Sequence, residues 1–284
     1  MNKLSVVIPK GSIYQSIIRL FDDAGIGLVI DERTYRPLVS DKEIEVKIMR
    51  PQNIPELIEL GAHDVGFTGL DWIKETDADI IEVADLELDR VKIVAAIPEK
   101  MNIKVLRKKK IVVASEYERI TKNWLNKKGY KYVFLRTYGA TEVFPPEDAD
   151  MIIDNTATGR TLNEHNLRII EELLQSSTRL IANRKAMNDP WKKNKILEIK
   201  MLFQAVLDAR DRVMLEMNVP KDRFNDVVKV LPCMRSPTVA PLYGEQGYAV
   251  KIAVRKNESV KLIPKLKKLG ATDILEYEFK KVVI

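Results

Sequence analysis

The stretch MIIDNTATGRTL, residues 151–162, combines residue types that could bind a sugar phosphate. Three apolar residues lead into Asp154, and three threonines and Gly159 follow before a segment that could begin a helix. Threonine hydroxyls donate hydrogen bonds, glycine lets the backbone approach a ligand closely, and N–H groups that begin a helix favour an anion. A carboxylate repels phosphate but accepts hydrogen bonds from a ribose diol. A phosphate-binding loop and an ordinary strand-to-helix turn both fit this pattern.

Four polar residues elsewhere follow predicted strands in the same way. Lys10 lies in PKG, Arg50 in RP, and Thr68 and Asp71 lie in FTGLD. Ligands of open α/β sheets bind at the carboxyl ends of the strands, so these side chains converge on one edge if their strands are neighbours. Lys10 by itself could equally be a surface lysine before a helix, and the convergence is the stronger signal.

Other catalytic signatures do not match. His63 and His165 are the only histidines, and neither has the spacing of a zinc motif. Neither a Gly-x-Ser-x-Gly elbow nor a Gly-x-x-x-x-Gly-Lys-Ser/Thr loop occurs. Cys233 is the single cysteine, which excludes an intrachain disulfide, and we expect it to be a packing residue.

The composition is that of a globular protein with a hydrophobic core. Of 284 residues, 45% are hydrophobic and 31% are charged, and this length predicts two or three domains. No apolar run approaches the roughly 20 residues that cross a bilayer, and no export signal is recognised, so we expect a cytoplasmic protein with no membrane partner. The net charge of +6 is mild, and the densest basic runs, at 107–110 and 191–196, are short. We therefore expect no nucleic-acid partner.

Strands that alternate with helices must position the candidate residues. The first part predicts strands at 4–8, 45–49 and 64–67, a helix capped by Ser12 and stopped by Gly25, a helix at 54–60, and a short helix after TGLD. The next part predicts strands at 110–114, 132–136, 149–153 and 179–184 and helices at 118–128 and 191–210. This alternation indicates a parallel sheet and an α/β fold. Segments 95–97 and 176–182 are candidate hinge strands between two lobes.

The pattern changes after residue 212. It predicts a strand at 213–218, an amphipathic helix at 220–231, an extended segment at 236–242, a strand at 248–254, a helix at 258–269 and a last strand at 274–284. This order is βαββαβ, the ferredoxin-like arrangement. We expect a small separate C-terminal domain.

Several motifs, in their order and spacing, resemble the long-form ATP phosphoribosyltransferases, the first enzymes of histidine biosynthesis. They are VVIPKG, EVKIMRPQNIPELIELGAHDVGFTGLD, ASEY, TEVFP, DNTATGRTL, STRLIANR, MNVP and SPTVAPL. The resemblance implies two α/β lobes similar to type II periplasmic binding proteins, with the active site in the cleft, and a C-terminal ferredoxin-like regulatory domain. The implied boundaries are 1–94 plus 181–210 for the first lobe, 95–180 for the second, and 211–284 for the regulatory domain.

The family transfers the 5-phosphoribosyl group of phosphoribosyl pyrophosphate (PRPP) to N1 of ATP, with Mg²⁺, giving phosphoribosyl-ATP and pyrophosphate. L-histidine inhibits it, and members assemble as dimers and hexamers. Adenine N1 is already a nucleophile and pyrophosphate leaves readily once its charge is held, so the protein mainly positions substrates and stabilises charge. This explains why no dedicated nucleophile is visible.

The resemblance also assigns residues by position. PRPP would be bound by Asp154, Thr156, Thr158, Gly159, Arg160, Thr161 and Leu162. The ATP and pyrophosphate side of the cleft would be lined by Lys10, Gly11, Arg50, Thr68, Gly69, Asp71 and Glu142. Histidine would be bound near Asn218, Ser236 and Thr238. The protein alone would supply no metal site, and Mg²⁺ would be held with the substrate phosphates.

The chain departs from the family pattern at a few positions. Ser12 stands where arginine is usual, Asp89 and Val91 in the stretch 86–93 replace a glycine and a cysteine of the adenine-side pocket, and Cys233 replaces a glycine near the regulatory loop. An alternative is therefore a non-catalytic histidine- or nucleotide-binding regulatory protein of the same fold. A phosphoribosyltransferase for another base is a third hypothesis. The retained loop at 154–162 argues against the regulatory protein, which would not need it, and the RPQNIPELIELG…GLD block and the C-terminal domain argue against a transferase for another base.

Overall fold

A computed structural model describes residues 2–29, 34–232, 234, 236–244 and 246–284. The packing role expected of Cys233 lies outside these residues. The chain separates into two compact units. One runs to Asp22 and resumes from Ile26 to Lys200, and the other holds Asp23–Gly25 and Met201–Ile284.

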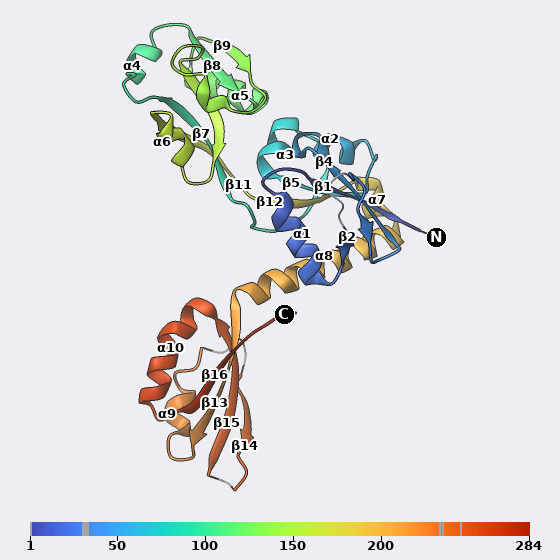
Figure 1. The fold of residues 1–284 in the computed structure, drawn as a ribbon, viewed down its shortest axis with the longest axis vertical. Helices are drawn as coiled ribbons and strands as arrows, with labels where there is room; N and C mark the ends of the chain where they lie inside the picture. Colours follow the sequence, from blue (N-terminus) through green and yellow to red (C-terminus); the bar gives the residue numbers. More distant parts are fainter. Residues whose placement is uncertain (1, 30–33, 233, 235, 245) are drawn as a thin grey trace. The chain divides into compact units, whose positions relative to one another are not determined.

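The first unit contains two five-stranded sheets. The first sheet has the order β4-β1-β5-β12-β6, and we call this sheet with its helices lobe I (Figure 1). Strands β1 (Leu4–Pro9), β4 (Ile44–Met49) and β5 (Val65–Gly69) run parallel. Strand β12 (Thr178–Ala182) is antiparallel to β5 on one side and to β6 (Ile81–Asp85) on the other. A segment from late in the chain therefore completes the middle of this sheet.

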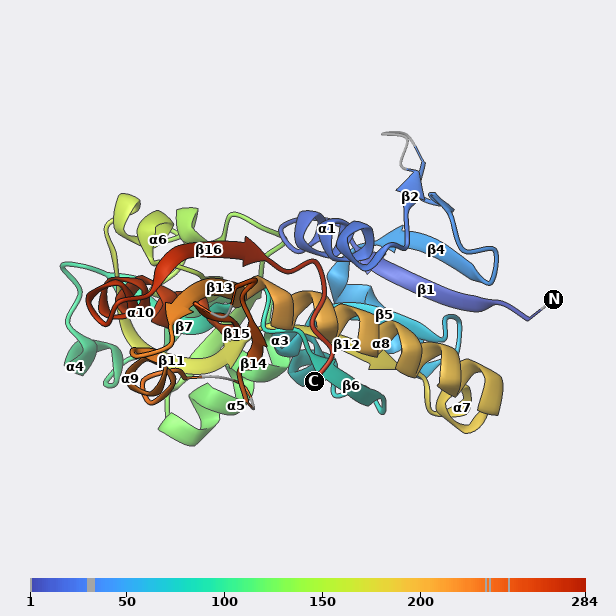
Figure 2. The ribbon, with the colours of Figure 1, turned by 90° about the horizontal axis from the view of Figure 1, so that it is seen from below.

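Helices cover both faces of the lobe I sheet. Phe21 of α1 packs edge-on against Phe67 on one face, while α2 and α3 pack on Val7 and Ile181 on the other. Gly66 permits this approach, because a Cβ there would collide with Ile54 of α2. Figure 2 shows α1 beside β1 and β4. The remaining elements are α1 (Tyr14–Ala24), β2 (Leu28–Val29), β3 (Leu38–Val39), η1 (Pro51–Asn53), α2 (Ile54–Glu59), α3 (Leu70–Thr76), α7 (Arg184–Asn188) and α8 (Pro190–Arg210).

The second sheet has the order β11-β7-β10-β8-β9, and we call it with its helices lobe II. Strands β8 (Ile111–Ser115), β9 (Tyr132–Arg136) and β10 (Met151–Thr156) are parallel, whereas β7 (Val91–Pro98) is antiparallel to β10 and to β11 (Leu167–Ser176). Leucines of α4 and α5 pack on one face, and a leucine of α6 packs on the other. The helical elements are α4 (Ile103–Leu106), α5 (Glu118–Lys128), η2 (Thr141–Val143) and α6 (Arg160–Glu164).

The chain crosses between the lobes at two places. The first crossing is the loop 86–90 between β6 and β7, and the second is Ser177 between β11 and β12. The predicted lobe boundaries after residues 94 and 180 fall inside β7 and β12. The hinge strand predicted at 95–97 is also wrong, because these buried residues pair with β10 and β11 inside the lobe II sheet. The polar stretch before Val91 interrupts the apolar run, and the chain crosses there.

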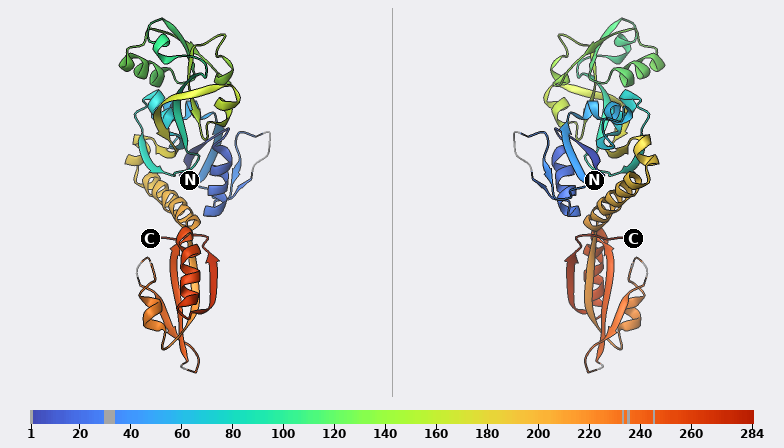
Figure 3. Two further views of the ribbon diagram at one scale, coloured as in Figure 1. Left: turned by 90° about the vertical axis from the view of Figure 1, so that its left-hand side faces the viewer. Right: turned by 90° about the vertical axis from the view of Figure 1, so that its right-hand side faces the viewer.

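The second unit is a four-stranded antiparallel sheet with the order β14-β15-β13-β16. Its elements are β13 (Arg212–Pro220), α9 (Phe224–Val228), β14 (Thr238–Pro241), β15 (Gly247–Arg255), α10 (Lys256–Lys268) and β16 (Thr272–Glu278). Alternate residues of β13 and β15 are buried under the two helices (Figure 3). This topology confirms the ferredoxin-like prediction.

Two predicted elements of this unit are shorter in the structure. The helix expected at 220–231 forms only over Phe224–Val228, because β13 extends to Pro220 and a turn closed by the Arg223 N–H and the Pro220 carbonyl follows. The last strand ends at Glu278 rather than at residue 284. Across the described residues, no helix has both the length and the apolar character that crossing a bilayer requires.

Candidate functional site

The loop predicted to bind a sugar phosphate lines a cavity of about 370 Å³ in lobe II, which we call the loop pocket. The cavity lies where β10 ends. Its lining residues are Glu116, Gly139, Ala140, Thr141, Glu142, Asp154, Asn155, Thr156, Ala157, Thr158, Arg160, Thr161 and Leu162. Six of the seven residues assigned to PRPP therefore line one cavity together with Glu142, which had been assigned to the ATP side.

The loop has a defined backbone conformation. Gly159 has φ +79°, in the left-handed region that glycine adopts most readily, and its N–H donates to the Thr156 hydroxyl at 2.8 Å. Helix α6 begins at Arg160, so the first N–H groups of the helix have no acceptor within it. Leu162 is 3% exposed and packs in the lobe II core. This leucine anchors the helix, and the polar loop before it faces the cavity.

Asp154 has a raised pKa. Burial raises it to about 7, opposed by the Asn155 backbone N–H, which donates to its Oδ1 at 2.7 Å. The carboxylates of Glu142 and Glu116 contribute to this raised pKa, and a hydrogen bond from Thr141 opposes it. Three carboxylates in one pocket favour ligands with hydroxyl donors or cations over bare phosphate.

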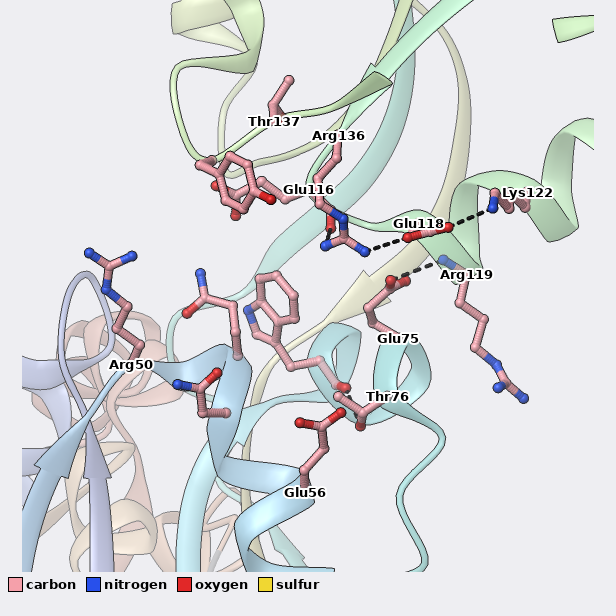
Figure 4. A pocket seen from close by; sticks show the side chains of 14 residues that line it. Arg50, Glu56, Glu75, Thr76, Glu116, Glu118, Arg119, Lys122, Arg136 and Thr137 are labelled. Atoms are coloured by element: carbon pink, nitrogen blue, oxygen red, sulfur yellow. Dashed lines mark hydrogen bonds and ion pairs between the residues drawn. The ribbon is translucent and has the colours of Figure 1, made fainter. Parts of the chain in front are cut away.

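A second cavity, of about 700 Å³, lies between the lobes, and we call it the interlobe cavity (Figure 4). Its lining residues are Arg50, Gln52, Asn53, Glu56, Trp72, Glu75, Thr76, Glu116, Glu118, Arg119, Lys122, Arg136, Thr137 and Tyr138. Glu116 lines both cavities, so the two adjoin. Figure 4 shows Arg50 on the lobe I side, while Arg136 and Lys122 on the lobe II side both pair with Glu118.

Cations in the interlobe cavity can bind anions. Arg50 is exposed, and within the described part of the chain its guanidinium forms no hydrogen bond or ion pair. Arg136 donates to Glu118 at 2.6 Å, and this contact raises the pKa of the arginine. A polyanion that enters the cavity could pair directly with Arg50. It would compete with Glu118 for Arg136 and Lys122.

The other residues assigned to the ATP side do not line these two cavities. Lys10 is exposed, and its ammonium donates to the Tyr35 hydroxyl at 3.3 Å. Gly11 is exposed with φ +102°. Thr68 is fully buried and donates to the Pro51 carbonyl at 3.2 Å. Gly69 is buried, and a Cβ there would collide with the carboxylate of Asp71.

Asp71 is also buried rather than open to the cleft. Its carboxylate accepts hydrogen bonds from Ser176 and Tyr117, both in lobe II. Sequence reasoning missed Glu116, Tyr117, Asn155 and Ser176. The motif ASEY contains two of them, but nothing in their types or spacing indicates chemistry without the fold.

The altered stretch 86–93 borders a third cavity, of about 410 Å³, at the lobe crossings. Val91 lines it, as do Arg179 of lobe I and Ala157 of the loop. Asp89 lies outside this lining, has φ +49°, and accepts hydrogen bonds from Ser16 at 2.7 Å and Thr178 at 3.1 Å. This aspartate thus ties α1 to the second crossing.

The residues assigned to histidine lie in the C-terminal unit. Asn218 on β13 donates to Asp273 at 2.9 Å. Thr238 begins β14, two strands away, and Ser236 is exposed just before it. Asn218 is paired with Ala249, which is paired with Ala240, so Thr238 lies two strands away from Asn218 and two residues along the strand.

The carboxylates do not form a metal cage by themselves. Within the described ranges, no group of three or more histidine, cysteine or acidic side chains has the geometry of a metal site. Mg²⁺ is commonly held by one or two carboxylates together with substrate phosphates. Glu116, Glu142 and Asp154 in the loop pocket fit that kind of binding.

Known proteins resemble this chain in sequence and in fold. Residues 50–205 match the family described as HisG, ATP phosphoribosyltransferase, and residues 209–281 match the HisG C-terminal domain. An ATP phosphoribosyltransferase of Pelotomaculum thermopropionicum is 41% identical over 99% of each chain, and one of Thermodesulfovibrio yellowstonii is 41% identical over 99% of this chain and 98% of its own. The solved ATP phosphoribosyl transferase (HisG:HisZ) complex from Thermotoga maritima has a chain with a TM-score of 0.63 and 23% identity, covering 71% of this chain and 98% of that one.

Proposed function

Because the chain belongs to the ATP phosphoribosyltransferase family, we propose that it transfers the 5-phosphoribosyl group of PRPP to N1 of ATP. The products are phosphoribosyl-ATP and pyrophosphate, and the reaction is the first step of histidine biosynthesis. The loop pocket carries the proposal, since it combines an acid for ribose hydroxyls with a glycine–threonine loop for phosphate.

We assign the phosphoribosyl group to the loop pocket. The Asp154 carboxylate, when ionised, would accept hydrogen bonds from the two ribose hydroxyls. The hydroxyls of Thr158 and Thr161 and the first N–H groups of α6 would donate to the 5-phosphate. Arg160 pairs with Glu164 at 2.8 Å, so its contact with phosphate would require exchange of that ion pair.

ATP and pyrophosphate would bind toward the interlobe cavity, which adjoins the loop pocket at Glu116. Arg50, on the opposite lobe, would hold negative charge that develops on the leaving pyrophosphate. Adenine N1 attacks C1 of the ribose as the C1–O bond to pyrophosphate breaks, through an oxocarbenium-like state. The protein then contributes alignment of the two substrates and fixed charges around the reacting carbon.

Mg²⁺ is the proposed cofactor. The metal would neutralise pyrophosphate charge, and Glu116 and Glu142 of the loop pocket would help to hold it together with the substrate phosphates. Feedback inhibition by L-histidine near Asn218 and Thr238 and assembly as a dimer or hexamer are further proposals from the family. A cytoplasmic location stays a prediction.

The experiment follows product absorbance when the purified protein is mixed with ATP, PRPP and Mg²⁺, with and without histidine. We expect turnover that histidine suppresses. Asp154→Ala should lower kcat/KM for PRPP at least a hundredfold, because a half-buried acceptor of two hydroxyls is lost, at roughly 1.5–3 kcal/mol for each hydrogen bond to a charged group. Asp148→Ala, an exposed aspartate of the same lobe outside both cavities, is the matched control.

Either of two results would contradict the proposal. Near-normal kcat/KM in Asp154→Ala would remove the ribose assignment. Absence of turnover by the wild-type protein, with histidine still bound, would favour the non-catalytic regulatory protein.

A further inference from the structure

Asp71 ties the end of the lobe I sheet to lobe II. The residue is 5% exposed. The Ser176 hydroxyl donates to its Oδ1 at 2.5 Å, and the Tyr117 hydroxyl donates to its Oδ2 at 2.8 Å. A buried carboxylate without such donors would be costly, so the contact between the lobes depends on both hydroxyls.

Tyr117 carries a polar group into an apolar environment. It is 1% exposed, and its ring packs on Trp72 of lobe I with centroids 4.7 Å apart. Burial, and then the charge of Asp71, raise the pKa of Tyr117 well above its usual value. The hydroxyl therefore keeps its proton and donates a hydrogen bond to Asp71. Its oxygen is left to accept from the side-chain amide of Asn155, whose Nδ2 lies 3.1 Å away.

Asn155 continues the connection into the loop pocket. Its backbone N–H donates to Asp154 Oδ1 at 2.7 Å, and its Nδ2 lies 3.5 Å from the same oxygen. Both residues lie near the end of β10 and line the loop pocket. A continuous set of hydrogen bonds therefore runs from Asp71 in lobe I, through Tyr117 and Asn155, to Asp154.

We propose that Tyr117 is a positioning residue for PRPP: its hydroxyl fixes the Asn155 amide, which orients the Asp154 carboxylate toward the ribose hydroxyls. The inference rests on the proposed function, because it assigns the ribose to Asp154. Through this hydroxyl, the contact of α3 with the start of α5 also sets the geometry of the loop pocket. Lobe I thereby influences a site whose lining residues all come from lobe II.

A packing role alone would need only the aromatic ring. Phenylalanine would keep the contact with Trp72 and the burial, and it would remove the hydroxyl, which donates to Asp71 and accepts from Asn155. Tyr117→Phe therefore separates packing from positioning. Asn155→Ala interrupts the same connection at an exposed residue and leaves the hydrogen bond between Tyr117 and Asp71 intact.

The test is a double-mutant cycle on PRPP binding, measured by titration calorimetry with the full chain and Mg²⁺ and without ATP. We expect the Kd for PRPP to rise about fivefold in Tyr117→Phe, the effect of roughly one hydrogen bond. Asn155→Ala should raise it at least as much, and the double variant should bind no worse than Asn155→Ala, because the two residues act in series. Tyr132→Phe, which removes a lobe II hydroxyl bonded to Asn126 outside both cavities, should bind as the wild type does.

The outcomes separate this inference from the function on which it rests. A wild-type protein that binds no PRPP would remove the proposed function itself. Wild-type binding together with unchanged Kd in Tyr117→Phe, or with multiplicative effects in the double variant, would overturn the positioning role alone. If Tyr117→Phe does not fold, wild-type-like binding by Asn155→Ala would overturn it equally.

Discussion

Asp154→Asn should stabilise the protein at neutral and alkaline pH while removing its affinity for PRPP. The pKa of Asp154 is raised from 3.8 to about 7 in the folded protein. Between these values the folded state holds the proton more tightly than the unfolded state, so the contribution of Asp154 to stability falls as pH rises. Because asparagine does not ionise, the stability of Asp154→Asn does not fall with pH for this reason.

The size of the effect follows from the pH range between the unfolded pKa of 3.8 and the folded pKa of about 7. Each pH unit inside it widens the difference in unfolding free energy between Asp154→Asn and wild type by about 1.4 kcal/mol. From about pH 5.5 to about pH 8 the difference grows by roughly 2 kcal/mol, and above that it stays constant. For 150–250 folded residues, this corresponds to a change of about 4–8 °C in Tm.

Thermal unfolding at about pH 5.5 and about pH 8 measures this directly, with the difference between variant and wild type taken at each pH. Asp148→Asn, an exposed aspartate, is the matched control and should show no such widening. A difference between Asp154→Asn and wild type that is the same at both pH values would refute the reasoning. It would mean that the acid ionises as freely in the folded protein as in the unfolded chain.

Three further results are expected. The KM for PRPP should rise as pH falls below about 7, because protonated Asp154 cannot accept from both ribose hydroxyls; initial rates that give a constant KM across pH 6–8 would contradict this. Gly159→Val should destabilise the protein by roughly 1–2 kcal/mol in denaturant unfolding and weaken PRPP binding, since φ of +79° is unfavourable for a β-branched residue, and unchanged stability would argue against strain. Leu125→Ala should cost about 2–5 kcal/mol through its cavity yet leave kcat/KM of the folded protein unchanged, and a selective loss of activity would show that core packing under α5 controls catalysis.

Local signals were sufficient for much of the fold. The helix Glu118–Lys128 and the strand Tyr132–Arg136 have the predicted bounds, because an acid begins the helix, Gly129 ends it with φ +73°, and β-branched and aromatic residues follow. The ferredoxin-like order of the last unit was likewise evident from period-two strands and one long helix. The loop at 154–162 could be identified from sequence because an acid, threonine hydroxyls and a glycine together are the groups that bind a sugar phosphate.

Contacts between residues far apart in the chain could not be predicted from the sequence pattern alone. Asp71 follows a strand as a cleft residue would, yet Ser176, 105 positions later, takes one of its oxygens and helps bury it. The convergence of Glu116 and Glu142 on Asp154 likewise depends on the order of strands in the sheet. The predicted position of the lobe crossing was wrong because Ala95–Ile97 is apolar throughout. Such a segment could be a strand inside a sheet or a connection between lobes.

The place of β12 in lobe I has a consequence for how the protein folds during synthesis. β12 lies between β5 and β6, so β6 has no neighbour in its sheet until residues 178–182 have left the ribosome. The nascent chain up to β6 can pair β4, β1 and β5 but leaves one side of β5 open. Lobe II is one uninterrupted segment, and it can close its own sheet first. We therefore expect the second lobe to fold cotranslationally before the first, with the open edge of β5 as the surface most prone to mispairing in the interval.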